Sequence, residues 1–273
     1  MLLGTLQDRA INESSGLVAS RRNPGLYWTH NDSGDGPFLY CLGNRGESCG
    51  TWSVAGAENR DWEDIAAGPG PVADRPYLYV GDIGDNLGDQ QQVTVYRVPE
   101  PEVRPEQATT NRSAPATTEQ ADVLRLRYPD GPHNAEALLV HPQTGDLYVV
   151  AKEAAPAVYV ARAPLRAGAV NPLVQLAVLS VGAGDARTGL VTGGDISPDG
   201  RHVALCTYGD GYELEVPSGA SFDAVWSQPP IRFPLGARPV GEAIAYRLDG
   251  KALLTTSEDP LGSGTPLLQV ERS

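Results

Sequence analysis

The stretch that decides the fold reads Asp61-Trp62-Glu63-Asp64-Ile65-Ala66, then a loop rich in Pro and Gly, then Tyr77-Leu78-Tyr79-Val80-Gly81-Asp82-Ile83-Gly84-Asp85-Asn86. This pattern predicts a short strand that begins with carboxylates, a turn, and a second strand that ends in carboxylates. An antiparallel pair brings the start of the first strand beside the end of the second. We therefore expect Glu63 and Asp82 to lie close together at one end of a hairpin.

Four other stretches repeat parts of this plan. Candidate first strands cover 13–17, 63–66, 136–139, 192–196 and 242–245. A turn with Pro or Gly follows each of them, and apolar second strands come next at 26–28, 78–80, 147–149, 203–205 and 252–254. Third strands follow at 38–40, 93–96, 157–159 and 267–270, and weaker fourth strands at 51–54, 123–127, 174–178 and 231–233. Four strands repeated at intervals of roughly 50 residues are typical of the blades of a β-propeller.

The repeat predicts an all-β fold, a single β-propeller domain over residues 1–273 with five four-stranded blades. The fifth repeat ends after its third strand, so we expect the N-terminal segment Leu3–Leu6 to close the ring by pairing with Leu267–Val270. The segment 99–121, rich in Pro, Thr, Ala and Glu, fits a surface loop excursion inside blade two. A β-sandwich is the alternative fold, but it would not explain the repeat.

Composition excludes several function classes. The formal net charge of −13 argues against a nucleic-acid partner, because phosphate contacts need clustered Lys and Arg. No apolar run approaches the ~18–20 residues of a membrane span, and residues 1–4 lack the features of a signal peptide. We expect a monomer that acts on a small molecule. It is either cytoplasmic or a secreted protein whose leader is absent from this sequence.

The cysteines are unevenly placed. Cys41 and Cys49 flank a seven-residue segment, so they could face each other across a hairpin, and we predict a disulfide between them. Such a bridge would favour an exported protein. Cys206 lies in an apolar run and is expected to be free and buried.

Carboxylates recur at the loops that lead into the first strands and at the ends of the second strands. In a propeller these places open on one face, so side chains from separate blades converge at the mouth of the channel. The predicted metal ligands are Glu13, Glu63, Asp82, Glu136, Asp195 and Glu242. So many like charges cannot all ionise without a counter-ion, and a hard cation, Ca²⁺ above all, would provide one.

Two features leave the metal hypothesis open. The pattern Asp-x-Gly-Asp at 32–35 and 82–85 also suits ordinary turns, in which Asp side chains cap their own loops. In blade four, alignment by the turn places Thr192 at the position of Glu242, whereas alignment by the carboxylate places Asp195 there.

The candidate acid–base groups at the mouth are His30, His133, Asp64, Lys152 and Tyr208. Histidine titrates near neutral pH and can move protons. For His30 and His133 the alternative is a hydrogen-bonded loop histidine. For Lys152, which lies among carboxylates, the alternative is a structural ion pair.

Segments 15–34, 61–66, 79–86 and 192–200 resemble a group of poorly characterised bacterial β-propeller proteins. That group is distantly similar to the calcium-dependent propellers of the SMP-30/gluconolactonase type and to the β-propeller phytases. The resemblance implies a channel metal that polarises an ester, lactone or phosphoester, with an adjacent carboxylate as base. We therefore expect a calcium-dependent hydrolase. The alternatives are an isomerase or cyclase of a biosynthetic pathway that uses the same pocket, and a non-catalytic binding module.

Overall fold

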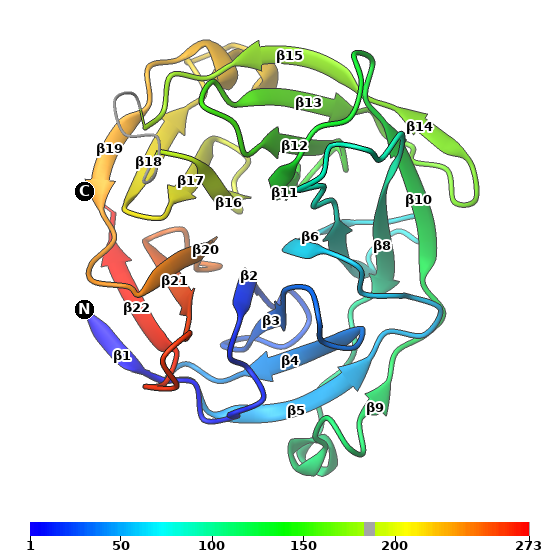
Figure 1. The fold of residues 1–273 in the computed structure, drawn as a ribbon, viewed down its shortest axis with the longest axis vertical. Helices are drawn as coiled ribbons and strands as arrows, with labels where there is room; N and C mark the ends of the chain where they lie inside the picture. The colour runs from blue at the N-terminus through cyan, green and yellow to red at the C-terminus, as the bar shows by residue number, and fades with distance from the viewer. Residues whose placement is uncertain (183–188, 273) are drawn as a thin grey trace.

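The computed structural model of the protein describes residues 1–182 and 189–272. Five small sheets stand around a central axis as the blades of a propeller (Figure 1). Three sheets have four strands and two have five, and the helices of the described residues are two short 3-10 segments, η1 (Pro105–Thr109) and η2 (Phe222–Ser227). No helix in the described part of the chain is long and apolar enough to cross a membrane. The predicted five-bladed β-propeller is confirmed.

Each blade begins with a strand at the axis and continues outward to the rim. Blade one contains β2 (Ser14–Ala19), β3 (Tyr27–Asn31), β4 (Phe38–Leu42) and β5 (Ser48–Ser53). Blade two contains β6 (Trp62–Pro69), β7 (Pro76–Asp82), β8 (Val93–Pro99) and β10 (Asp122–Arg127). Blade three contains β11 (Ala135–Val140), β12 (Leu147–Ala151), β13 (Ala157–Ala161) and β15 (Val174–Val178). Blade four contains β16 (Val191–Ile196), β17 (His202–Thr207), β18 (Asp210–Glu215) and β19 (Ile231–Pro234). Blade five contains β20 (Val240–Tyr246), β21 (Ala252–Glu258), β22 (Pro266–Glu271) and β1 (Leu2–Thr5).

The N-terminal strand closes the ring, as predicted. β1 pairs antiparallel with β22, with Leu2 opposite Leu268 and Thr5 opposite Pro266. The two ends of the chain lie beside each other at the rim of blade five (Figure 1). Closure removes the exposed sheet edge that an open fifth blade would present to other chains.

Two short strands tie neighbouring blades together at the rim. The excursion inside blade two contains η1 and β9 (Ala116–Thr117), and β9 runs parallel to β5, the outer strand of blade one. In the same way β14 (Val170–Pro172), from blade three, runs parallel to β10 of blade two. The excursion is thus a strap across the preceding blade, which its composition alone did not indicate.

The apolar core lies between adjacent blades. All six residues of β2 and of β11 are buried, because each inner strand has a neighbouring blade on both sides, whereas no residue of the outer strand β15 is fully buried. Between blades two and three, Tyr79 and Val95 share one buried cluster with Leu138 and Tyr159. Burial of apolar surface, at about 25 cal/mol per Å², therefore holds the blades in a fixed ring.

A β-bulge recurs near the start of the inner strand in all five blades. In blades one to four the residue that the bulge adds is, in order, Ser15, Glu63, Glu136 and Thr192. In blade five the shift covers Glu242 and Ala243, and Glu242 directly follows the last paired residue, as the four others do. A bulge re-aims the side chain that it adds, so these residues form one ring of equivalent positions. The ring also settles the register of blade four, where Thr192 takes the position of Glu242.

The predicted disulfide is wrong in this structure, where Cys41, Cys49 and Cys206 are all free thiols. Cys41 lies opposite Gly50, and a register shift follows between Cys41 and Leu42. Cys49 is therefore the unpaired residue at this irregularity and is not the cross-strand partner of Cys41. Cys206 is buried and free, as expected.

Candidate functional site

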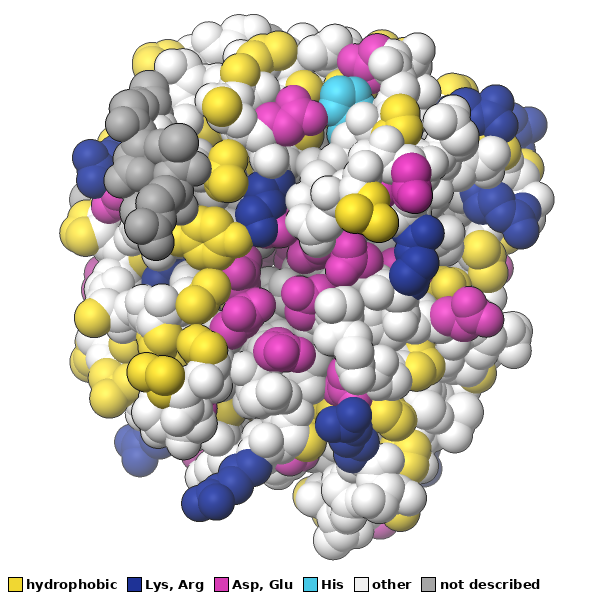
Figure 2. Space-filling view, in the orientation of Figure 1, with side chains coloured by type: hydrophobic (Ala, Val, Ile, Leu, Met, Phe, Trp, Pro, Cys, Tyr) yellow, Lys and Arg dark blue, Asp and Glu magenta, His cyan; other side chains and the backbone are white. Residues whose placement is uncertain are grey.

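The ring of bulge positions places three glutamates in the mouth of the channel. Glu63, Glu136 and Glu242 are only 4, 4 and 5% exposed. Burial raises the pKa of Glu63 well above its usual value, and the charge of Glu136 raises it further. Burial and the same Glu136 charge raise the pKa of Glu242 to about 9. Carboxylates that disturb one another in this way lie close together, and Figure 2 shows acidic side chains gathered around the hollow at the centre of this face.

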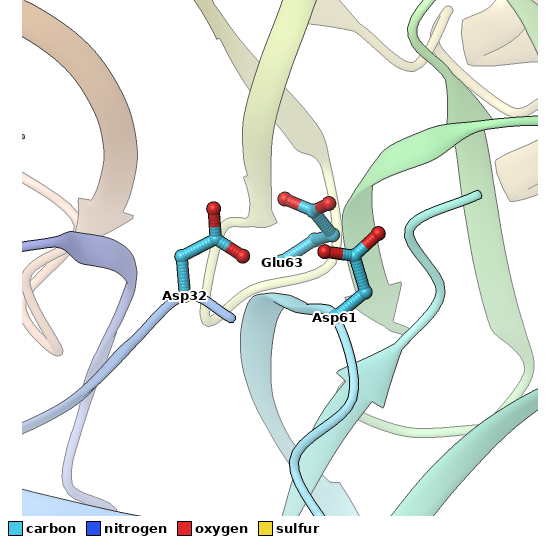
Figure 3. Close-up of side chains that lie close together, drawn as sticks. All are labelled: Asp32, Asp61 and Glu63. Carbon is cyan, nitrogen blue, oxygen red and sulfur yellow. The ribbon is translucent and has the colours of Figure 1, made fainter. Parts of the chain in front are cut away.

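Three carboxylates from two blades converge at one side of the mouth. Oxygen atoms of Asp32, Asp61 and Glu63 all lie within 4.8 Å of one another (Figure 3). Asp32 follows β3 of blade one, while Asp61 precedes β6 of blade two and Glu63 lies within it. The side-chain carboxylate of Glu63 accepts no hydrogen bond from any described residue, although the residue is almost completely buried. We refer to these three residues as the acidic triad.

Gly84 leaves the space that the triad uses. A Cβ atom at this position would lie 2.2 Å from Glu63 Oε1 and 2.3 Å from Asp61 Oδ2. Any other residue would therefore push the two carboxylates from their positions. Gly84 belongs to the segment Asp82-Ile83-Gly84-Asp85, so this motif shapes the site through its glycine.

The carboxylates of that motif hold the loops around the triad. Asp82 Oδ1 accepts a hydrogen bond from the backbone N–H of Asp61 at 2.9 Å, which fixes the loop that carries Asp61. Asp85 accepts from the N–H groups of Asp89 at 3.2 Å and Gln90 at 2.9 Å. Asp82 and Asp85 thus cap loops, as the turn interpretation suggested, whereas Asp32, the first residue of the blade-one motif, belongs to the triad.

Lys152 brings a positive charge into the mouth. It follows β12, and its ammonium forms an ion pair with Glu136. Its Nζ lies 5.0 Å from the centre of the Tyr208 ring, at the end of blade four's second strand. Burial disfavours the charged amine, but the Glu136 carboxylate outweighs burial and raises the pKa of Lys152. Burial raises the pKa of Glu136 to about 7, and the Lys152 charge opposes this rise.

Asp64 forms the floor beneath the ring. Its side chain has no exposed surface and accepts hydrogen bonds from the N–H groups of Ile65 at 2.8 Å, Leu138 at 2.9 Å and Gly194 at 3.2 Å. These donors belong to the inner strands of blades two, three and four, so the carboxylate lies at the axis and closes the channel. Burial raises the pKa of Asp64 well above its usual value, partly offset by its backbone donors.

The structure places His30 inside the protein and not at the mouth. The side chain is fully buried, and its Nδ1 lies 2.9 Å from the carbonyl oxygen of Asn31. Its ring contacts Trp62 edge-on, with ring centres 5.7 Å apart. Burial lowers the pKa of His30 to about 4, so the ring is neutral near pH 7.

His133 lies in the loop before β11 within a polar network. Its Nδ1 lies 2.7 Å from Glu153, and its Nε2 lies 3.0 Å from Asp130 and 2.8 Å from the Tyr159 hydroxyl. Burial opposes protonation, but the bonds to Glu153 and Asp130 outweigh it and raise the pKa of His133. The next residue, Asn134, accepts a hydrogen bond from the N–H of Asp85 at 2.7 Å, which links this network to the loop beside the triad.

Two expected ligands, Glu13 and Asp195, are not members of the triad. Glu13 is half-buried, forms a β-bridge with Glu258 and accepts a hydrogen bond from the Asp32 N–H at its carbonyl oxygen. Asp195 lies three residues beyond the bulge of blade four, about 10 Å further along the strand. Its carboxylate accepts from the N–H groups of Ile196 and Tyr246, both at 2.8 Å, and so joins blade four to blade five.

Sequence reasoning did not choose Asp32 and Asp61 as ligands, although both lie in the loops it assigned to the mouth. The alignment of first strands pointed instead to Glu13, and the expected hairpin beside Glu63 pointed to Asp82. The signal that could have found them is the spacing around Glu63, because Asp61 lies two residues earlier and shares its side of the strand.

No family model and no curated relative matches this chain. Among solved structures, one titled as a nidogen/laminin complex is 15% identical, with a TM-score of 0.48, and the match covers 89% of this chain and 71% of the other. The hydrazine synthase of Kuenenia stuttgartiensis is 10% identical, with a TM-score of 0.46, and the match covers 95% of this chain and 72% of the other. At this level of similarity neither structure carries information on the function of this chain.

Proposed function

We propose that the acidic triad binds one Ca²⁺ ion and that the mouth of the channel hydrolyses an ester, lactone or phosphoester of a small substrate. The observation that carries the proposal is the convergence of Asp32, Asp61 and Glu63 within 4.8 Å. Three negative charges at this distance repel one another unless a cation or protons lie between them. The propeller group that the sequence resembles is distantly similar to calcium-dependent propellers, which is in line with this choice.

The residues present fit a hard divalent cation. All three donors are carboxylate oxygens, the ligands that Ca²⁺ prefers, and Ca²⁺ accepts six to eight of them in flexible geometry. Gly84 keeps the space beside Asp61 and Glu63 open. Asp82 fixes the backbone of Asp61. Water and substrate would complete the coordination, and the bound ion would supply Lewis-acid polarisation of a substrate oxygen.

Among the predicted acid–base groups, those that keep some accessible side-chain surface can contact a substrate directly. Lys152 and His133 each keep about 16% of their side-chain surface accessible, and Tyr208 is half-buried. Asp64 and His30 are fully buried, so both serve as positioning residues in this proposal.

We assign the acid–base role to Glu136, which occupies the ring position next to Glu63 and whose pKa of about 7 suits proton transfer at neutral pH. In the proposed step, Glu136 takes a proton from the attacking water as the new bond to carbon or phosphorus forms. It then returns that proton to the leaving oxygen as the ester bond breaks. Lys152 holds the Glu136 carboxylate in place.

Calorimetric titration of chelator-treated protein with CaCl₂ tests the cation site. We expect one Ca²⁺ per chain, and at least about tenfold weaker binding in Glu63→Gln, since one carboxylate of three is lost. Gly84→Ala should weaken binding similarly, because the added Cβ displaces flexible carboxylates and leaves the backbone intact. Asp249→Asn is the matched control: it removes one charge in the turn after β20, on the opposite face, and should bind like the parent.

Turnover of a panel of p-nitrophenyl esters, lactones and phosphoesters, with Ca²⁺ and with EDTA, tests the reaction. Calcium-dependent hydrolysis of one class that is lost in Glu136→Gln supports the proposal. A chain that binds Ca²⁺ but hydrolyses nothing would be a non-catalytic binding module. A chain that binds neither Ca²⁺ nor Mg²⁺ would overturn the proposal as a whole.

A further inference from the structure

The ring of bulge positions has a gap in blade four. Glu63, Glu136 and Glu242 occupy the position in blades two, three and five, but blade four supplies Thr192. The hydroxyl of Thr192 donates to the carbonyl oxygen of Gly241 at 2.9 Å, so it contributes no charge. Glu136 and Glu242 therefore flank a place in the ring that has no carboxylate of its own.

The ammonium of Lys152 stands over this gap. On one side it forms its ion pair with Glu136 of blade three, and on the other its Nζ lies 5.0 Å from the ring centre of Tyr208 in blade four. The backbone N–H of Lys152 donates to the carbonyl oxygen of Asn134 at 2.9 Å, which fixes the base of the side chain. A positive charge is thus already built into the half of the mouth that the triad does not use.

Glu242 completes this second half. It is 5% exposed. Its backbone carbonyl oxygen accepts a hydrogen bond from the Cys206 thiol at 3.1 Å, but its side-chain carboxylate accepts none from any described residue. Among the ion pairs of the described residues, the pair between Lys152 and Glu136 is the only one that a glutamate of the ring makes. The carboxylate of Glu242 is therefore buried without a partner among the described residues, whereas that of Glu136 is paired with the Lys152 ammonium.

We propose that Lys152 is a tethered cation that fills a second cation position between Glu136 and Glu242, and that it limits the mouth to a single divalent ion. This inference rests on the proposed binding of Ca²⁺ by the acidic triad. The ammonium of Lys152 is covalently attached to the chain and therefore always occupies this position. A second metal ion would instead exchange with ions in solution. The residue thereby sets the cation stoichiometry of the site.

The substitution Lys152→Met, which replaces the ammonium side chain by an uncharged one of similar length, tests the proposal. Calorimetric titration with CaCl₂ should give one ion per chain for the parent and for Lys152→Arg, which keeps the charge. Lys152→Met should bind two ions, because Glu136 and Glu242 then lack their resident cation. The double variant Lys152→Met/Glu136→Gln should return to one ion, because the second position has lost a ligand.

The outcomes distinguish the role proposed for Lys152 from the proposed binding of Ca²⁺ by the acidic triad. A parent chain that binds no Ca²⁺ would refute the triad itself. A parent with one ion, together with a Lys152→Met chain that also binds one at the same affinity, would overturn the tethered cation and leave the triad standing. If Lys152→Met unfolds without cations, refolding it in CaCl₂ gives the same test, and a refolded chain that holds only one ion counts against the proposal.

Discussion

The carboxylate of Glu100, which directly follows β8 of blade two, accepts a hydrogen bond from the indole Nε1 of Trp28 in blade one at 2.9 Å. Both residues are buried, with 1 and 0% exposure. The same carboxylate accepts from the N–H groups of Arg21 and Arg22, both at 3.1 Å, and from the Ser20 hydroxyl. One side chain therefore holds the turn after the inner strand of blade one against its neighbour.

Glu100→Ala should be among the most destabilising single changes in the chain. It leaves several buried donors without an acceptor, at a cost of roughly 3 kcal/mol or more in the free energy of unfolding. Urea denaturation measures this value. Glu102→Gln is the control, because the half-exposed Glu102 pairs, among the described residues, with Arg22 and Arg104. Exposed ion pairs contribute little to stability, so the free energy of unfolding of this variant should stay close to that of the parent. Equal effects of the two changes would contradict the role given to Glu100.

Removal of residues 1–5 should destabilise the whole domain, because it deletes β1 and exposes the edge of β22. We expect the melting temperature to fall by at least about 5 °C, on the scale of 2–4 °C per kcal/mol for domains of this size. Gly4→Ala should act in the same direction, because its Cβ would lie 2.2 Å from the carbonyl oxygen of Arg45 in blade one. A truncated chain that melts like the parent would show that the ring does not need this strand.

The stability of the metal-free protein should fall as pH rises. Burial raises the pKa of Glu136 to about 7 and that of Glu242 to about 9, from a usual value of 4.5. The folded chain therefore holds protons that the unfolded chain releases, so stability is fullest below pH 4.5 for these groups and is lost as pH rises through 7 and 9. Melting curves in EDTA between pH 5 and 9 measure this slope, and Ca²⁺ should flatten it. A melting temperature that rises over this range in EDTA would contradict the assignment.

The pKa values of His30 and His133 should be shifted in opposite directions from the usual value for histidine. His30 has a pKa lowered to about 4 by burial, whereas the bonds of His133 to Glu153 and Asp130 raise its pKa above 6.5 against the effect of burial. Histidine ring signals followed by NMR from pH 4 to 8 resolve the two. Glu153→Gln should lower the pKa of His133 and leave His30 unchanged. A normal pKa for His30 would mean that its side chain reaches water.

Thiol titration should find three free cysteines in denaturant without reductant, since the structure holds no disulfide among them. In the folded protein one thiol should react rapidly. The hydrogen bond from Cys41 lowers the pKa of Cys49 to about 7, and the thiolate is the reactive form, whereas Cys41 and Cys206 are buried. Detection of a single thiol in denaturant would restore the disulfide between Cys41 and Cys49.

The repeat predicted the blades and their closure because strand alternation and turn residues are local signals. The segment Leu78-Tyr79-Val80 and its four counterparts are second strands in the structure, and β1 completes blade five as expected. The strap β9 was not predicted, because two residues, Ala116 and Thr117, carry too little pattern to indicate pairing with another blade.

The membership of the acidic triad was predicted only in part, since Glu63 was expected as a ligand and Asp32 and Asp61 were not; part of the reason is geometric. Each inner strand contains one extra residue, and a shift of one residue moves a side chain to the other face of a strand. The bulge turns Glu63 toward the mouth, whereas the adjacent Asp64 forms the floor. The same device places Cys49 at an unpaired position beside Cys41. Bulges depend on the packing of five strands around one axis, and no local sequence pattern reports that packing.

The floor formed by Asp64 makes the channel a cup with a single opening. A solute that reaches the ring of glutamates must leave by the way it came, past the loops that carry Asp32 and Lys152. Solutes therefore enter and leave through the same mouth, and a bulky molecule bound in the mouth would trap any ion bound below it. A small ion has to bind before such a molecule and dissociate after it, so exchange of the ion should slow whenever the mouth is occupied.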